Sequence, residues 1–375
     1  MDFLRPTHVH IHLDRLMTNI RFMQGLSMEH AFLCPMIKAN AYGHGDVAVA
    51  KALEKVNCQF VGVASVEEGL NLRKNYVDLE VLCFGFLGLD AVSEMLQSKL
   101  TPVVSSLRQL EHIAKKAKRP VNIHLKLNTG MNRLGLVESD LQDVQKILQD
   151  SPAIQVVGIG THLFQGADIG QESSESVKQI FGFEKMLATL GRSNVFLHVY
   201  NSSALATMIL GKKKLTYGAR PGLLAYGIDP LKNSSLKPLI SPVMEFKSKI
   251  VSIQQVKSGD VVSYGGIWQA PRDSVVGIVP AGYADGVCRS LSDCGEFLIG
   301  GQRAPIRGRV CMDYTMVDCT DLTLPMDRLV GEDVVIFGEQ GSQEISVNEV
   351  AQKAGRVNYE IMTGISERVI RFYGA

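Results

Sequence analysis

The sequence lacks the features that would indicate a nucleic-acid-binding, membrane-spanning or secreted protein. Its formal net charge is only +1, from 39 basic and 38 acidic residues, so neither nucleic acid nor an anionic membrane surface is indicated as a partner. No uninterrupted apolar run is long enough to span a bilayer. Residues 1–12 mix charges and three histidines, unlike the apolar core of a signal peptide. We therefore expect a cytoplasmic protein.

Paired cysteines are also missing. The seven cysteines are scattered singly, are odd in number and form no CxxC motif. This spacing favours reduced thiols over a disulfide framework or a zinc site, and no metal is expected. With 46% hydrophobic residues, a chain of 375 residues can bury a large core and has the length of two domains.

Short apolar stretches alternate with segments of helical period from about residue 31 to residue 222. The stretches are rich in Val, Ile and Phe, and they are too short for buried helices. They are FLCPMIKA (32–39), FVGVAS (60–65), LEVLCFGF (79–86), LTPVVSS (100–106), VNIHLKLNT (121–129), QVVGIGTHL (155–163), VFLHVYNSS (195–203) and LTYGARPG (215–222). Eight strand–helix units predict an α/β fold, a (β/α)8 barrel of the TIM type, over residues 1–235.

The pattern of alternating strand-like and helical segments ends after Asp229. Pro230, Pro238 and Pro242 mark a linker, and the strand-like runs beyond it have no long helices between them. These runs are VMEFKSKIVSIQQV, SVVGIVP, APIRGRV, TMVDCT and DVVIFG. We predict a mainly β second domain over residues 236–375, with which residues 1–12 can also pack.

Reactive side chains collect where the predicted barrel strands end, which is where barrel enzymes carry their active sites. Lys38, Arg133, His162 and Arg220 occupy such positions. A lysine there can lose its charge by desolvation and become a Schiff-base amine, although a lone strand-end lysine more often reaches into solvent.

An anion site is indicated on the same rim. Asn201 and Ser202 end an apolar strand and can open a helix, whose N-terminal amides suit a phosphate. Gly222 and Leu223 follow the last strand, at the usual phosphate position of barrels. Serine caps are common, so Ser202 alone would be equally compatible with a structural role.

Five motifs occur in an order that resembles alanine racemase. They are KANAYGHG (38–45), NTGMNRLG (128–135), GYADG (282–286), GRVCMD (308–313) and NYE (358–360). The resemblance covers the chain from the first barrel strand to the second domain. It implies an isomerase that uses pyridoxal 5'-phosphate (PLP) to interconvert L- and D-alanine, and so supplies D-alanine for cell-wall peptidoglycan.

The resemblance also implies roles for individual residues. Lys38 would bond PLP covalently and act as the base for D-alanine, and Tyr264 would be the opposing base for L-alanine, supplied across a homodimer interface. Arg220 would face the pyridine nitrogen, keep it unprotonated, and connect with His162 to the tyrosine. The remaining cofactor residues would be Tyr42, Arg133, Asn201, Ser202, Gly222, Leu223 and Tyr359.

Substrate contacts follow from the same resemblance. Arg133 would bind the substrate carboxylate together with Met312, and Tyr283 would form a pocket wall. Lys126 alternates with apolar residues in the fifth strand, where an unpaired buried charge is costly. In the family this lysine is carbamylated and orients Arg133. Cys311 is interpreted as a packing residue.

Three departures from the family pattern stand out. His12 occupies a position that is commonly acidic, Asn132 replaces a small residue, and the stretch THLFQGADIG is one residue longer, which affects the entry gate near Gly166–Asp168. A racemase of broader specificity, for serine or basic amino acids, is the main alternative. A non-catalytic PLP-binding protein would be a lone barrel, and a PLP decarboxylase would need a Cys–Asp pair that we do not find.

Overall fold

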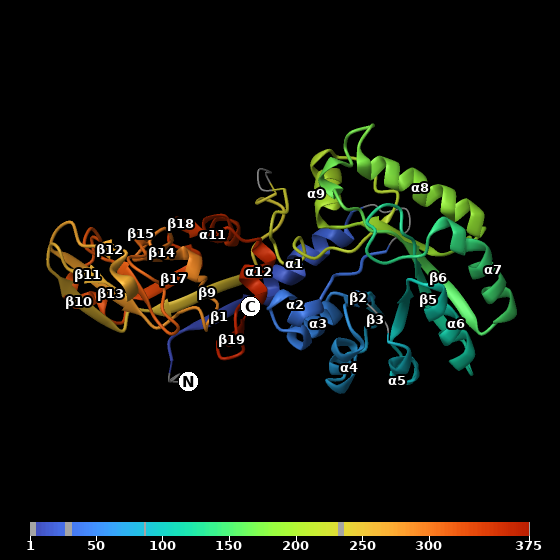
Figure 1. Ribbon diagram of the computed structural model, residues 1–375, viewed down its shortest axis with the longest axis horizontal. Coiled ribbons are helices and arrows are strands. Elements are labelled where there is room, and N and C mark those ends of the chain that lie inside the picture. The colour runs from blue at the N-terminus through green and yellow to red at the C-terminus, as the bar shows by residue number, and fades with distance from the viewer. Residues whose placement is uncertain (1–4, 27–31, 86–87, 232–235, 375) are drawn as a thin grey trace. The chain divides into compact units, whose positions relative to one another are not determined.

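The computed structural model describes residues 5–26, 32–85, 88–231 and 236–374, and the chain divides into two compact units (Figure 1). The barrel unit comprises Leu16–Ala41 and Gly45–Ser241. The β unit comprises Met1–Arg15, Tyr42–His44 and Pro242–Ala375. Residue 235, the predicted boundary, lies outside the described residues.

Seven parallel strands run in sequence order through the barrel unit. They are β2 (Phe60–Val63), β3 (Glu80–Cys83), β4 (Thr101–Val104), β5 (Val121–Lys126), β6 (Ile154–Gly160), β7 (Phe196–Tyr200) and β8 (Gly218–Ala219). Residues 32–37 stand in place of the first barrel strand, because Cys34 N donates to Ala219 O and Ile37 N donates to Gly62 O. Pro35 has no N–H to donate, so this segment pairs only through isolated bridges. The predicted (β/α)8 barrel is confirmed.

Helices follow the strands and surround them (Figure 1). They are α3 (Asp46–Lys55), α4 (Val66–Lys74), α5 (Val92–Gln97), α6 (Leu107–Lys116), α7 (Leu141–Asp150), α8 (Glu175–Leu190) and α9 (Ser202–Leu210), with α1 (Leu13–Gln24) ahead of the first strand segment. Their starts are coded locally: Ser65 and Glu68 form a capping box at α4, and Ser106 and Ser174 cap α6 and α8. No helix in the described part of the chain combines the length and apolarity needed to span a bilayer.

Aromatic side chains fill part of the barrel interior. Phe32 packs on Phe60 and Phe196 with ring centroids 4.8 and 5.5 Å apart, in a buried cluster that also contains Leu82 and Val103. These residues come from the first strand segment and from strands β2, β3, β4 and β7. Their packing holds the strand ends, and therefore the side chains that follow them, in fixed positions.

The β unit is built on a mostly antiparallel sheet in the order β15-β14-β17-β9-β1-β19. Its strands are β1 (His8–His12), β9 (Met244–Lys249), β14 (Glu296–Ile299), β15 (Gln302–Pro305), β17 (Asp333–Gln340) and β19 (Ile370–Gly374), and β18 (Gln343–Ile345) pairs with β17. A second sheet contains β10 (Ser252–Val256), β13 (Ser274–Val279) and β16 (Thr315–Asp318), and β11 (Val261–Val262) pairs with β12 (Trp268–Gln269).

Two details of the β unit differ from the predicted runs. The run VMEFKSKIVSIQQV is two strands, because the chain leaves the larger sheet after Lys249 and joins the smaller one at Ser252. Helices α11 (Val347–Ala354) and α12 (Asn358–Thr363) were not anticipated, although Ser346 caps α11 through Glu349 N.

Candidate active site

Positively charged side chains gather at the strand ends of the barrel unit. Burial, followed by the charge of Arg133, lowers the pKa of Lys38. Burial, followed by the charges of Arg133, Arg220 and Lys38, lowers the pKa of Lys126 to about 8. The predicted strand-end cations therefore share one electrostatic environment, which is strongly positive and suited to an anionic ligand.

The backbone after Lys38 is unusual. Ala39, Asn40, Ala41 and Tyr42 all have φ between 51° and 54°, so α2 (Lys38–Tyr42) is a left-handed turn. Such a turn costs roughly 1–2 kcal/mol per non-glycine residue, and backbone strain of this kind clusters at functional sites.

Glu68 holds the start of this left-handed turn. Its Oε1 accepts from Ala39 N at 2.7 Å, while Oε2 accepts from Ala64 N at 2.7 Å. One carboxylate thus joins the residue after Lys38 to the N-terminus of α4, and its charge faces Lys38.

Arg220 is buried and bonded only to neutral acceptors. Nη1 donates to His198 O at 2.7 Å and lies 2.6 Å from His198 Nδ1, and Nη2 donates to Thr161 O at 2.6 Å. Burial lowers its pKa to about 10, which still leaves it charged at neutral pH. No carboxylate neutralises this guanidinium among the described residues, so its positive charge acts on the buried groups around it.

A chain of neutral histidines supports Arg220. His198 Nδ1 faces the guanidinium, so it must accept, and Nε2 must then carry the hydrogen toward His124 Nδ1, 2.9 Å away. Burial and the charge of Arg220 lower the pKa of His124 to about 3 and hold that of His198 well below its ordinary value. His198 also stacks on Phe32 at 4.7 Å, which fixes the ring.

His162 is also neutral at physiological pH. Burial, then the charges of Arg220 and Arg133, lowers its pKa to about 3. Gln179 Nε2 donates to His162 O at 3.2 Å and so ties its backbone to α8. A histidine in this state can donate or accept a hydrogen bond but does not add a charge.

The loop that carries Arg133 is a tight return of the chain after β5. Leu136 N donates to Lys126 O, and Asn128 N donates to Leu136 O, both at 2.8 Å. Asn132 has φ 52°, a conformation that asparagine tolerates, and its Oδ1 accepts from Asn128 Nδ2 at 3.0 Å. The departure at Asn132 therefore fits the turn that presents Arg133.

Backbone amides and a hydroxyl form an anion cradle at the start of α9. Asn201 caps the helix through Ala204 N, and Ser202 Oγ accepts from Gly222 N at 2.9 Å. Since Ser202 Oγ already accepts, its hydrogen is available to a ligand. The N–H groups of Ser203 and Leu223 donate to no acceptor within the described ranges. This arrangement matches a phosphate site.

Tyr264 lies in the β unit on an exposed bend, with 73% of its surface accessible. Ser263, Gly265 and Gly266 all have positive φ, and two glycines make such a bend possible. Ser263 Oγ donates to Arg309 O at 2.7 Å, which braces the bend against the GRVCMD segment. The phenol is thus presented outward from a fixed backbone.

An open hollow of the β unit adjoins Tyr264. Its lining consists of Ser263, Tyr264, Ile278, Cys311, Met312, Asp313, Tyr314 and Met316. Met312 is 53% exposed, and Cys311 Sγ forms a hydrogen bond of 3.4 Å with Ser263 Oγ. Tyr283 N donates to Cys311 O at 3.0 Å, so Tyr283 and Met312 are held on neighbouring backbone segments.

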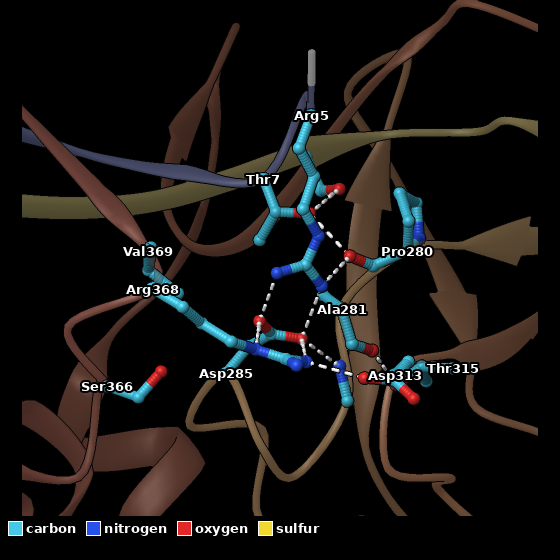
Figure 2. Close-up of polar contacts among 12 residues, drawn as sticks. Arg5, Thr7, Pro280, Ala281, Asp285, Asp313, Thr315, Ser366, Arg368 and Val369 are labelled. Atoms are coloured by element: carbon cyan, nitrogen blue, oxygen red, sulfur yellow. Dashed lines mark hydrogen bonds and ion pairs between the residues drawn. The ribbon is translucent and has the colours of Figure 1, made fainter. Parts of the chain in front are cut away.

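A buried carboxylate underlies these two segments (Figure 2). Asp285 has no exposed surface and is reached from two sides by Arg5 and Arg368, at distances of 2.5–3.0 Å. Its Oδ2 also accepts from Gly282 N at 2.8 Å, and Arg368 Nη2 donates to Asp313 Oδ1 at 2.8 Å. Burial would raise the pKa of Asp285, but the bonds from both arginines outweigh it and lower the pKa.

Tyr42 and Tyr359 also come together within the β unit, with ring centroids 5.7 Å apart. Gly43 allows this approach: its φ is 84°, and a Cβ there would lie 2.3 Å from Met362 O. Arg371 Nε donates to Gly43 O at 2.7 Å and holds the segment in place.

Comparisons with known proteins agree with this geometry. The alanine racemase N-terminal domain model matches residues 11–230, and the C-terminal domain model matches residues 243–373. The chain belongs to the alanine racemase family. An alanine racemase of Sorangium cellulosum is 37% identical over 99% of both chains.

Solved alanine racemases share the fold. The enzyme from E. faecalis superimposes with a TM-score of 0.90 at 29% identity, covering 100% of both chains. The Bartonella henselae alanine racemase, whose crystal structure holds covalently bound pyridoxal phosphate, gives 0.86 at 26% identity over 98% of this chain and 99% of that one.

Sequence analysis of this alanine racemase family member missed three residues that organise its site. Glu68, His198 and Asp285 were not assigned roles. The capping-box spacing of Ser65 and Glu68 was a usable signal for the first. His198 and Asp285 act through partners distant in the sequence, so only the folded chain identifies them.

Proposed function

We propose that this chain racemises alanine with PLP in the cytoplasm, using Lys38 and Tyr264 as its two acid/base groups. The observation that carries the proposal is the strand-end cluster around Lys38. Burial and the neighbouring Arg133 lower the pKa of this amine, which favours the nucleophilic neutral form. The same cluster supplies positive charge for the phosphate and for a substrate carboxylate.

The described residues fit PLP. The cradle offers the Ser202 hydroxyl and the unpaired amides of Ser203 and Leu223 to the phosphate, and Gly222 N holds the Ser202 oxygen in place. Asn201 caps the first turn of α9, and Tyr42 and Tyr359 of the β unit would be further phosphate contacts, as the family resemblance implies. Bound at Lys38, PLP withdraws electrons from the substrate α-carbon and so acidifies its proton.

Arg220 has a defined part in this proposal. Its uncompensated charge would oppose protonation of a pyridine nitrogen held beside it, because two like charges roughly 4 Å apart repel by about 4 kcal/mol at an effective dielectric of 20. An unprotonated cofactor ring would be a weaker electron acceptor. His162, kept neutral by the same charge, can relay a hydrogen bond without adding a second cation.

Tyr264 is proposed as the base on the opposite face of the substrate, supplied by the partner subunit of a homodimer. Its phenol is 73% exposed, and it belongs to a different unit from Lys38. Arg133 would bind the substrate carboxylate together with the Met312 amide, and Tyr283 would form part of the pocket wall. The wall is supported by bonds of adjacent residues: Gly282, next to Tyr283, donates to Asp285, and Asp313, next to Met312, accepts from Arg368.

The Tyr264→Phe variant tests the two-base assignment. Loss of a general base typically costs 10²–10⁴-fold, and racemisation should fall by about that factor in both directions. In deuterated water the variant should still exchange the α-proton of D-alanine through Lys38, whereas exchange from L-alanine should nearly stop.

Tyr314→Phe is the matched control, because Tyr314 lines the same hollow and is also exposed. It should keep both exchange reactions within a few-fold of the unmodified enzyme. Equal loss of exchange from both enantiomers in Tyr264→Phe would rule out Tyr264 as the second base. A panel of D- and L-amino acids would separate alanine from broader specificity.

A further inference from the structure

Two histidines and a glutamate converge on one face of the β unit, apart from the residues assigned to the reaction. His10 and His12 project from the same face of β1, while Val9 and Ile11, which alternate with them, are fully buried on the other face. Strand β9 runs beside β1 (Figure 1), and its residue Glu245 pairs with His10. One ligand atom from each of the three lies within 4.8 Å of the others.

We propose that His10, His12 and Glu245 bind one divalent transition-metal ion of the Zn²⁺ type. Two imidazoles and one carboxylate are a ligand set that Zn²⁺ uses, with a fourth position left for water. The sequence-based expectation of no metal rested on the cysteines, and these three ligands come from elsewhere.

The distances suit such an ion. Ligand atoms about 2.05 Å from a tetrahedral Zn²⁺ lie about 3.3 Å from one another. His12 Nε2 and Glu245 Oε2 are already 3.3 Å apart. His12 Nε2 is buried and forms no hydrogen bond of good geometry within the described residues, which is a cost that a metal would remove. His10 lies beside it, with ring centroids 4.1 Å apart, and offers a ligand atom within 4.8 Å of those of His12 and Glu245.

Two glycines leave room for these side chains. A Cβ at Gly338 on β17 would lie 3.0 Å from Glu245 Cβ and Cγ, and a Cβ at Gly374 on β19 would lie 2.7 Å from His10 Nε2. At these two positions the neighbouring strands therefore place no side chain against Glu245 and His10. This packing limits where Glu245 and His10 can point.

A neighbouring lysine would compete with a metal ion for Glu245. Lys247 Nζ lies 2.6 Å from Glu245 Oε2, and a bound metal would have to displace it from that oxygen. The lysine side chain is 29% exposed and can move to solvent. His8 is the other titratable group on this face, but its ring packs edge-on against Phe372 at 5.2 Å.

Metal titration of the PLP-loaded enzyme tests the site. Zn²⁺ binding is measured by competition with a chromogenic chelator, in a Cys294→Ser background that removes an exposed thiol. One equivalent per chain should bind, and Co²⁺ should give the visible bands of a four-coordinate ion. His10→Gln and His12→Gln should each weaken binding at least tenfold, whereas His8→Gln, on the same face of β1, should not.

A gain of affinity keeps the test independent of any folding defect. Lys247→Met removes the competing cation but no ligand, so it should bind Zn²⁺ several-fold more tightly. Crystals soaked in Zn²⁺ should show anomalous density in contact with His10, His12 and Glu245. Binding that survives in His10→Gln, density elsewhere, or no tightening in Lys247→Met would each overturn the proposal.

Discussion

Among single side chains, Arg220 has a wide influence: its charge lowers the pKa of several neighbouring groups. After burial, its charge is the next cause of the low pKa of His124, His162 and His198. It also contributes to the lowered pKa of Lys126. Its hydrogen-bond acceptors are two carbonyls and a neutral imidazole, so no described partner neutralises this charge.

Replacing Arg220 should change these histidines in a predictable direction. Arg220→Gln removes the charge, so the pKa of His162 should rise from about 3 toward its ordinary value, though only in part because burial remains. Arg220→Lys keeps the charge and should leave the pKa low. Titration of ¹⁵N-labelled histidines measures both. A His162 pKa that stays as low in Arg220→Gln would assign the effect to burial and to the other cations, such as Arg133, and not to Arg220.

Lys126 is expected to carry a carbamate. It is nearly buried, and within the described residues no carboxylate pairs with its ammonium. With a pKa of about 8, roughly a tenth of the amine is neutral at pH 7, and only the neutral amine reacts with CO₂. At fixed dissolved CO₂, carbamate should therefore increase from pH 7 to pH 9.

Carbon-13 NMR with labelled bicarbonate checks the carbamate. One carbamate resonance should appear in the unmodified enzyme and in Lys178→Gln, which changes an exposed lysine of α8. It should vanish in Lys126→Gln. If no resonance appears at any pH, Arg133 must be oriented by other contacts.

Among the structural elements of the β unit, several loops are held together by one buried carboxylate. Asp285 links the N-terminal segment, the GYADG turn and the segment before β19 through Arg5, Gly282 and Arg368 (Figure 2). The GYADG turn is joined in turn to GRVCMD by backbone bonds from Tyr283 and Ala284. The exposed Tyr283 and Met312 therefore rest on a buried ionic contact.

Asp285→Asn should destabilise the β unit. The substitution leaves two arginines without their anion. Because both arginines are partly exposed, we expect the free energy of unfolding to fall by about 2–3 kcal/mol, near the low end for broken buried pairs. Asp313→Asn, which removes one exposed partner of Arg368, should cost under about 1 kcal/mol. Urea unfolding measures both changes.

The pH dependence gives this prediction a second check. The folded-state pKa of Asp285 is lowered, so its contribution is present above the unfolded pKa of about 3.9 and is lost as the pH falls through the folded value. The stability difference between the unmodified enzyme and Asp285→Asn should thus shrink in acid. A difference that is constant with pH would point to packing and not to charge.

At the scale of the whole molecule, the two proposed bases belong to different units of the chain. Lys38 belongs to the barrel unit and Tyr264 to the β unit. If each active site takes Tyr264 from the partner subunit, one subunit carrying Lys38→Ala and one carrying Tyr264→Phe can together form one intact site.

Subunit mixing tests this arrangement. Each variant alone should be nearly inactive, and after exchange about half of the dimers are mixed, each with one working site. Activity should then recover to about a quarter of the unmodified level, since half of the dimers each keep half of their sites. Mixtures of Lys38→Ala with itself are the control. No recovery after verified exchange would contradict the shared site.

The order of strands and helices, the barrel class and the site motifs could be predicted from the sequence, because they depend on local patterns. Apolar stretches separated by helical segments specify the barrel, and Lys38, Arg133 and Arg220 stand at strand ends whatever their neighbours are. The left-handed turn after Lys38 was not predictable, since alanine does not favour that conformation.

Protonation and long-range contacts were decided by the tertiary structure alone. The low pKa values of Lys126 and His162 come first from burial, which is a property of the whole packed unit. The contact of Arg5 with Asp285 and that of His10 with Glu245 join residues more than 200 positions apart. No local pattern encodes such pairs, because their distance is set by how all the intervening elements fold.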